Sequence, residues 1–383
     1  MRREPGYRGL FEPDEYARVG EFYRAHPDLE PAPLVRLPGL AADLGLGGLL
    51  VKDESGRFGV DAFKITGARY AMASLGPERL RAGVVCATAG NHGRAVARAA
   101  RDLGIACTVF LPAADPGASA IELRTRRARV AAMQADGAAT LDVDGTYEGA
   151  ISRAAGYASE TGAAVVSDAS WPGYEEIPRL VMLGYTHIFE EASRQWDRAP
   201  DVVLIQGGVG GLVCAAANWF AMRFGAARPF LIACEPESAA CLLASARAGR
   251  LVSITDATPG GRRAEPADAP RRPAIGSRPA DGNTPPPTIM AGLRCAVPSP
   301  AAWPSIHAGV DAFIAIPDAF AVEAMERLAR PARRDPAVAA GPSGACGVGT
   351  LLALARSPDL AAIGEACRFD RSIRAMAVVT ESP

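Results

Sequence analysis

Short apolar runs, separated by segments with a helical apolar period, constrain the fold of this chain more than any other feature. The runs are bounded by Gly, Pro or Asp, and such runs are typical of strands buried on both faces. Helices between consecutive buried strands imply parallel βαβ units and therefore an α/β fold. The predicted strands are residues 84–87, 107–111, 163–166, 202–205 and 230–233.

Length and charge limit the function classes. A chain of 383 residues is long enough for two domains and a large core. Its net charge of -1 gives no electrostatic basis for binding nucleic acid or an anionic membrane. No apolar run reaches the roughly 18 residues of a membrane span, and no signal-peptide core is present. The eight cysteines and four histidines are scattered without metal-ligand spacing. We therefore expect a cytoplasmic protein with mostly reduced thiols, no metal, and neither nucleic acid nor membrane as a partner.

One lysine is the first candidate for chemistry. Lys64 follows Phe63 where a strand is expected to give way to a helix, which opens with the small residues Thr66, Gly67 and Ala68. The helix dipole and partial burial would lower the pKa of an amine at this place and expose its nucleophilic neutral form. The alternative is an ordinary surface lysine at a helix start.

A loop of small residues at 87–94 follows the first predicted strand and opens a helix. Backbone N–H groups are free at a helix N-terminus and can hold an anion such as a carboxylate. The side-chain amide of Asn91 can also bond a ring hydroxyl. A structural turn is the alternative, because turns that contain Gly-Asn are common.

A second loop follows the strand predicted at 202–205 and contains Gly207, Gly208, Val209, Gly210 and Gly211. Such a run lets the backbone wrap a phosphate ahead of a helix dipole. It lacks the Lys-Ser/Thr ending of a P-loop and the spacing of a dinucleotide fingerprint. A tight strand-to-helix turn without a ligand is the alternative.

In this order and at these separations, the motifs resemble those of the fold-type-II pyridoxal-phosphate enzymes, and within that group the diaminopropionate ammonia-lyases. The resemblance covers nearly the whole chain outside residues 257–287. The segments that carry it are Lys52-Asp-Glu-Ser-x-x-Phe58-Gly59 with Phe63-Lys64, Gly90-Asn-His-Gly93, Asp168-Ala-Ser-Trp171-x-Gly-Tyr174, Met182-x-Gly-Tyr185, Thr288-Ile-Met-Ala-Gly-Leu293, Ser343-Gly-Ala345 and Val379-Thr-Glu381.

The resemblance implies a two-domain α/β fold, in which each domain is a mostly parallel sheet flanked by helices, and a homodimer. The larger domain would comprise residues 1–66 and 196–383, and the smaller domain residues 67–195. Residues 257–287 are dense in Pro, Gly, Arg and Asp. We predict a disordered surface insertion there, with a lid over the site as the alternative.

The resemblance also implies pyridoxal 5'-phosphate as the cofactor and assigns roles to residues. Lys64 would hold the cofactor covalently and later move protons, while Asp168 would remove or relay substrate protons unless it is only a turn residue. The remaining roles are these: Phe63 beside the ring, Asn91 on the phenolic oxygen, Gly207, Gly208, Val209, Gly210 and Gly211 on the phosphate, the Thr380 hydroxyl near the pyridine nitrogen, and Thr88, Ala89, Gly90 and His92 around the substrate. A loop-ordering role is the alternative for His92. A hydroxyl does not keep the ring nitrogen protonated, which favours elimination over transamination or racemisation.

The activity implied is α,β-elimination on a small amino acid, with 2,3-diaminopropionate converted to pyruvate and ammonia. Ala89 departs from the family, whose members carry an aspartate implicated in handling the second amine or the D-enantiomer. A serine/threonine dehydratase, a β-replacement enzyme and a catalytically weakened cofactor-binding paralogue therefore remain alternatives. Cys241 and Cys295 fall where the family carries cysteines, and either a disulfide or two reduced thiols fits the sequence.

Overall fold

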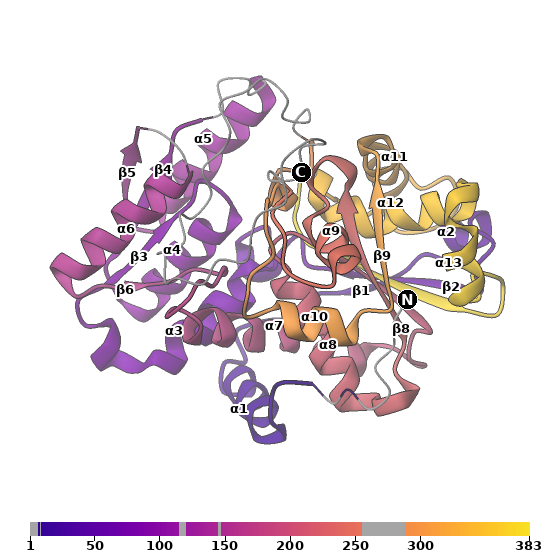
Figure 1. The fold of residues 1–383 in the computed structure, drawn as a ribbon, viewed down its shortest axis with the longest axis horizontal. Helices are drawn as coiled ribbons and strands as arrows, with labels where there is room; N and C mark the ends of the chain where they lie inside the picture. The colour runs from indigo at the N-terminus through magenta and orange to yellow at the C-terminus, as the bar shows by residue number, and fades with distance from the viewer. Residues whose placement is uncertain (1–6, 8, 115–119, 145–146, 255–287) are drawn as a thin grey trace.

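The computed structural model describes residues 7, 9–114, 120–144, 147–254 and 288–383 (Figure 1). The segment predicted as an insertion, residues 257–287, lies outside the described residues. Within the described part, two separate sheets carry the fold, and Figure 1 shows the smaller one on the left and the larger one on the right.

The larger sheet has six strands in the order β1-β2-β10-β7-β8-β9. All neighbouring strands pair in parallel except β1, which is antiparallel to β2. The last strand of the chain thus lies between one N-terminal strand and one from the middle. The bounds are β1 Leu34–Arg36, β2 Gly48–Asp53, β7 Val202–Gln206, β8 Phe230–Pro236, β9 Ala312–Ile316 and β10 Arg374–Val379.

The smaller sheet has four parallel strands in the order β5-β4-β3-β6. Its edge strand β5 is largely exposed, whereas β3 and β4 are mostly buried. The bounds are β3 Val84–Ala87, β4 Cys107–Pro112, β5 Ala139–Val143 and β6 Ala164–Val165.

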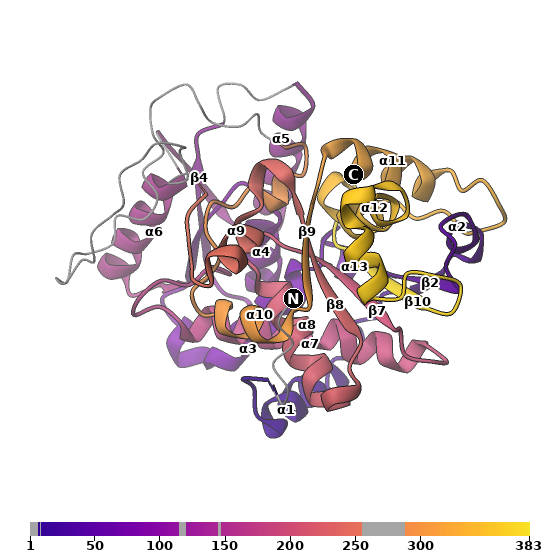
Figure 2. The same ribbon diagram turned by 45° about the vertical axis from the view of Figure 1, so that its right-hand side comes forward.

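Helices cover both faces of the larger sheet (Figure 2). In β10, Ala375 and Ala377 join the core beneath α2, α11 and α12, while Met376 and Val378 join the core beneath α7, α8 and α10. This alternation is the period of two expected of a strand buried on both faces. In the smaller sheet, α3 and α4 pack on one face and α6 on the other. The helices are α1 Pro13–Arg24, α2 Pro38–Asp43, α3 Lys64–Leu80, α4 Asn91–Leu103, α5 Ala120–Ala135, α6 Tyr147–Thr161, α7 Glu176–Gln195, α8 Gly211–Phe224, α9 Cys241–Ala248, α10 Trp303–Gly309, α11 Asp318–Ala329, α12 Pro342–Arg356 and α13 Ala361–Ala366.

The predicted α/β fold with mostly parallel sheets is confirmed. The five predicted runs lie in β3, β4, β6, β7 and β8 with small differences at their ends, whereas the other strands were not among them. The predicted domain boundaries fall in the first turn of α3 and at the end of α7, and they stay a prediction. No single described helix is long and apolar enough to cross a membrane. One pair of helices, Pro342–Arg356 and Pro358–Ala366, has the length and composition of a span when taken together, but it is bent by 99°.

Two glycines let α3 and α7 approach closely. A Cβ on Gly184 would lie 3.0 Å from the Cα of Gly67. A Cβ on Gly67 would lie 2.6 Å from the carbonyl oxygen of Val181 and 2.4 Å from the ring of Tyr185. Because one of these atoms is backbone, a side chain at Gly67 would move α3, which begins with Lys64.

We therefore expect Gly67→Ala to lower the free energy of unfolding by about 1–3 kcal/mol, the usual cost of overpacking a core. The matched control is Gly156→Ala in α6, where a Cβ would meet nothing within 4 Å. That change should stabilise the protein by up to about 1 kcal/mol, because alanine is the better helix former. Thermal or urea unfolding measures both, and equal effects of the two changes would contradict the close-packing argument.

Candidate active site

The residues singled out in the sequence gather at the carboxyl ends of parallel strands, where ligands of open α/β sheets bind. The loop with Asn91 follows β3, and Asp168 follows β6. In the larger sheet, the glycine loop follows β7, and Thr380 follows β10. Lys64 begins α3 between these groups.

Lys64 and Asp168 form an ion pair in which the lysine Nζ donates to the carboxylate Oδ2. Their side chains are only 21% and 14% exposed. Burial disfavours the ammonium form, but the facing carboxylate outweighs it and raises the pKa of Lys64 above its ordinary value. Burial likewise opposes ionisation of Asp168, but Lys64 holds the pKa of that carboxyl below its usual range. The expected lowering of the lysine pKa was therefore wrong for the protein without cofactor, because the sequence did not reveal the carboxylate opposite it.

A pair of packed aromatic rings lies next to the lysine. Nζ of Lys64 lies 5.1 Å from the centroid of the Phe63 ring, and that ring packs against Tyr185 with centroids 4.8 Å apart. Among the described residues, the buried Tyr185 hydroxyl has no hydrogen-bond partner. A buried hydroxyl without a partner is costly, so this atom marks a place where a ligand group would be stabilising.

The loop after β3 is ordered by its own side chains. The hydroxyl of Thr88 accepts a hydrogen bond from the Gly90 backbone at 3.0 Å. Nε2 of His92 bonds the Val166 carbonyl at 2.9 Å, while its Nδ1 lies 4.0 Å from Asp168. His92 is buried, and this geometry supports its alternative role of fixing the loop against β6. The substrate-binding roles given to Thr88, Ala89 and Gly90 stay predictions.

The glycine loop has the shape of an anion cradle. Gly210 has a left-handed φ of 96° and caps α8, so the free N–H groups of that helix follow directly. A Cβ on Gly210 would lie 2.4 Å from Ile306, and one on Gly208 would lie 3.3 Å from Cys295. The Val209 carbonyl is fixed by the Ser299 N–H at 2.8 Å. A side chain at Gly210 is thus excluded and one at Gly208 would be crowded, in a turn that faces the positive end of α8.

Two cysteines lie at the same turn. Sγ of Cys241 bonds the carbonyl of Gly208 at 3.5 Å, and all eight cysteines of the chain are free. Burial raises the pKa of the Cys295 thiol to about 12. In this structure neither Cys241 nor Cys295 forms a disulfide.

Glu381, two residues after the end of β10, brings into the site a carboxylate for which no role was predicted. Glu381 is buried, and its Oε2 accepts a hydrogen bond from the Asn91 amide at 2.5 Å and lies 3.4 Å from Arg129. Its other oxygen accepts from the Ser343 N–H at 3.3 Å. Thr380 is buried beside it, and its carbonyl accepts from the Phe63 N–H at 3.0 Å. Glu381 belongs to a motif of the resemblance, but its partners come from distant segments, so only the fold reveals its position.

Comparison with known proteins assigns the chain to a family. Residues 26–362 match the model of the pyridoxal-phosphate dependent enzyme family, and the chain belongs to that family. It is 29% identical to diaminopropionate ammonia-lyase of Escherichia coli strain K12 over 97% of this chain and 89% of that protein. It is 30% identical to the Salmonella typhimurium diaminopropionate ammonia-lyase over 94% of this chain and 87% of that protein.

A solved structure is similar over the whole chain. The E. coli diaminopropionate ammonia-lyase in complex with an aminoacrylate-PLP azomethine reaction intermediate matches with a TM-score of 0.81 and 28% identity, covering 100% of this chain and 91% of that one. The predicted fold-type-II architecture and the cofactor, pyridoxal phosphate, are confirmed by these matches.

Removing the carboxylate opposite the lysine tests the electrostatics of the site. We expect Asp168→Asn to lower the pKa of Lys64, because burial would then act without the opposing charge. Each unit of decrease multiplies the neutral fraction by about ten at pH values below the pKa. The measurement is the pH dependence of Lys64 labelling by an amine reagent in the cofactor-free protein, read by mass spectrometry.

The matched control is Glu176→Gln, which removes the surface carboxylate that pairs with Arg79. That variant should label Lys64 with the same pH profile as the wild type. A labelling profile unchanged by Asp168→Asn would show that the carboxylate does not raise the pKa of Lys64.

Proposed function

We propose that this protein catalyses pyridoxal-phosphate-dependent α,β-elimination on a small amino acid, with 2,3-diaminopropionate as the preferred substrate. With one water, the products are pyruvate and two molecules of ammonia. The observation that carries the proposal is the partly buried pair of Lys64 and Asp168, together with the glycine loop that follows β7. Its similarity to diaminopropionate ammonia-lyases over nearly the whole chain supports the substrate.

The residues present fit the cofactor. The loop from Gly207 to Gly211 would hold the phosphate at the start of α8, and Lys64 would hold the cofactor covalently, with the Phe63 ring beside it. Asn91 would bond the phenolic oxygen. Thr380, directly after β10, would place its hydroxyl near the pyridine nitrogen. When bound, the cofactor withdraws electrons from the substrate and acidifies its Cα–H bond.

The chain's own groups then handle protons. Once Lys64 has lost its proton, its amine can take the proton of the substrate Cα and return it to the leaving group. Asp168 lies within hydrogen-bonding distance of that amine, so it can stabilise the lysine whenever the lysine is charged. The loop at Thr88 to His92 would hold the substrate carboxylate with the N–H groups that begin α4.

A dehydratase acting on L-serine or L-threonine is the second candidate, and Ala89 is the observation that favours it. An apolar methyl in place of the family aspartate suits a hydroxyl at the β carbon better than a charged amine. We also propose, from the resemblance alone, a homodimer that works in the cytoplasm.

Lys64→Ala should abolish formation of 2-oxo acid and ammonia without unfolding the protein, because covalent capture and proton transfer both need the amine. The assay is a panel of amino acids that includes both enantiomers of 2,3-diaminopropionate, L-serine and L-threonine. Added thiols or amines would trap a β-replacement product. Residual turnover above a few per cent of the wild type would contradict the role of Lys64.

Ala89→Asp should shift the kcat/KM ratio from L-serine towards 2,3-diaminopropionate, because a carboxylate attracts a charged β-ammonium group. The wild type should discriminate strongly against D-diaminopropionate. Ala89→Asn is the control of similar size without charge, and it should not produce the shift. Equal wild-type rates on D- and L-diaminopropionate would contradict this role of position 89, and a different residue would then have to take the proton from the D-enantiomer.

A further inference from the structure

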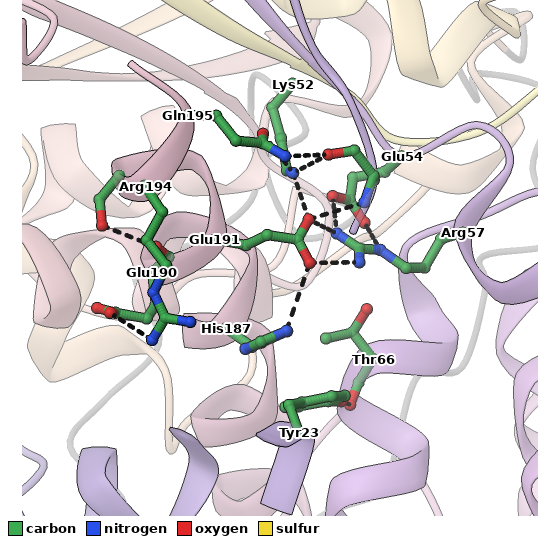
Figure 3. A network of polar contacts seen from close by, with 12 residues as sticks. Tyr23, Lys52, Glu54, Arg57, Thr66, His187, Glu190, Glu191, Arg194 and Gln195 are labelled. Atoms are coloured by element: carbon green, nitrogen blue, oxygen red, sulfur yellow. Dashed lines mark hydrogen bonds and ion pairs between the residues drawn. The ribbon is translucent and has the colours of Figure 1, made fainter. Parts of the chain in front are cut away.

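A buried network of charged side chains lies outside the candidate active site (Figure 3). Four of its members are almost fully shielded from solvent, with exposed fractions of 0% for Lys52, 0% for Glu54, 1% for Arg57 and 6% for Glu191. The Arg57 guanidinium donates to Glu191 at 2.8 and 2.9 Å and to Glu54 at 2.6 Å. Lys52 donates to Glu191 and to the carbonyl of Ala32.

Stability alone is a weak explanation for such a network. Removing four charges from water is costly, and apolar side chains of similar volume often stabilise a core as well or better. The positive and negative members balance, and Arg57 makes charge-assisted bonds to both carboxylates at once. Such bonds are directional, so the network fixes the relative positions of the segments that carry it.

One route from the network leads along the chain to Lys64. Arg57 stands in a 3-10 turn, Arg57–Gly59, that connects β2 to α3. Phe58 within this turn and Asp61 just after it have left-handed φ values of 47° and 58°, which are strained for residues with a side chain. From the other side, α4 holds the connection through Arg94, which donates to the Asp61 carboxylate at 2.6 Å.

A second route leads through space. His187 on α7 stacks on the Tyr23 ring with centroids 3.7 Å apart, and its Nε2 lies 3.4 Å from Glu191. The Tyr23 hydroxyl donates to the carbonyl of Thr66 at 2.5 Å, in the first turn of α3 (Figure 3). Network and helix start are therefore joined by one tyrosine, in addition to the connection through the backbone.

We propose that Arg57, Glu191 and Tyr23 are positioning residues that hold the first turn of α3 so that the Lys64 amine meets Asp168 and the cofactor. The inference rests on the proposed role of Lys64 as the cofactor lysine. A displacement of about 1 Å at reacting atoms can cost on the order of 100-fold in rate, so a rigid support for this lysine has a large effect.

Tyr23→Phe removes the single hydroxyl that joins network and helix and leaves the ring stack in place. Its matched control is Tyr16→Phe on the same helix α1, because the buried Tyr16 hydroxyl has no partner among the described residues. We expect Tyr23→Phe to lower kcat about tenfold with KM within roughly twofold. The rate at which the cofactor-free protein captures pyridoxal phosphate, followed by absorbance, should fall by a similar factor. Tyr16→Phe should change neither quantity.

Glu191→Gln provides the second variant, with Asp311→Asn as its control. Asp311 pairs with Arg228 in another buried ion pair, with 2.6 Å between the charged atoms. Both variants should lose thermal stability, but only Glu191→Gln should slow cofactor capture and lower kcat. If Glu191→Gln does not fold, the comparison of Tyr23→Phe with Tyr16→Phe tests the proposal without it.

Equal capture rates and equal kcat values for Tyr23→Phe and Tyr16→Phe would overturn the proposal and leave the network a purely structural role. The capture rate needs no substrate. A wild type that captures the cofactor but eliminates nothing from diaminopropionate or serine would contradict the proposed function, while the capture rates would still decide the role of the network.

Discussion

The pairing of β10 with both β2 and β7 is the constraint on which the site depends. Since β10 is the last strand of the chain, the larger sheet is incomplete until the C-terminal residues lie between strands from earlier in the sequence. The same pairing carries Thr380 to the backbone of Phe63 and Glu381 to Asn91. One strand thus completes the core, fixes the residue before Lys64 and brings a carboxylate to the loop after β3.

Buried charges act in two ways in this molecule. Between Lys64 and Asp168, the opposing charges keep the lysine protonated in the protein without cofactor. Covalent capture needs the neutral amine, so the proton must leave before or as the cofactor binds. In the network of Lys52, Glu54, Arg57 and Glu191, each charged group instead pairs with an opposite charge of the same network. The first pair can change its charge during a reaction, whereas the second is suited to staying fixed.

Much of the fold could be predicted from local pattern, because strands buried on both faces appear as apolar runs. The edge strand β5 was not predicted, because Asp142 and other exposed residues interrupt its apolar pattern. The short β1 is antiparallel and leaves no run of its own. The motifs located Lys64, Asp168 and the glycine loop, but their electrostatics could not follow from local sequence. The pKa of Lys64 depends on a carboxylate 104 residues away in the chain. Similarly, the charges at Lys52, Glu54 and Arg57 look like a surface segment until α7 is placed against them.

Position 89 does not by itself determine the charge around a substrate. The family aspartate is replaced by Ala89, yet the neighbouring Asn91 amide is bonded to the carboxylate of Glu381, which arrives from the other end of the chain. That carboxylate is only partly compensated, because Arg129 lies 3.4 Å from one oxygen and a neutral N–H bonds the other. A negative charge introduced at position 89 would therefore join two carboxylates already near this loop, Glu381 beside Asn91 and Asp168 beside His92. Since like charges repel, a carboxylate added at position 89 would be most stable with a cation beside it, such as the β-ammonium group of a substrate.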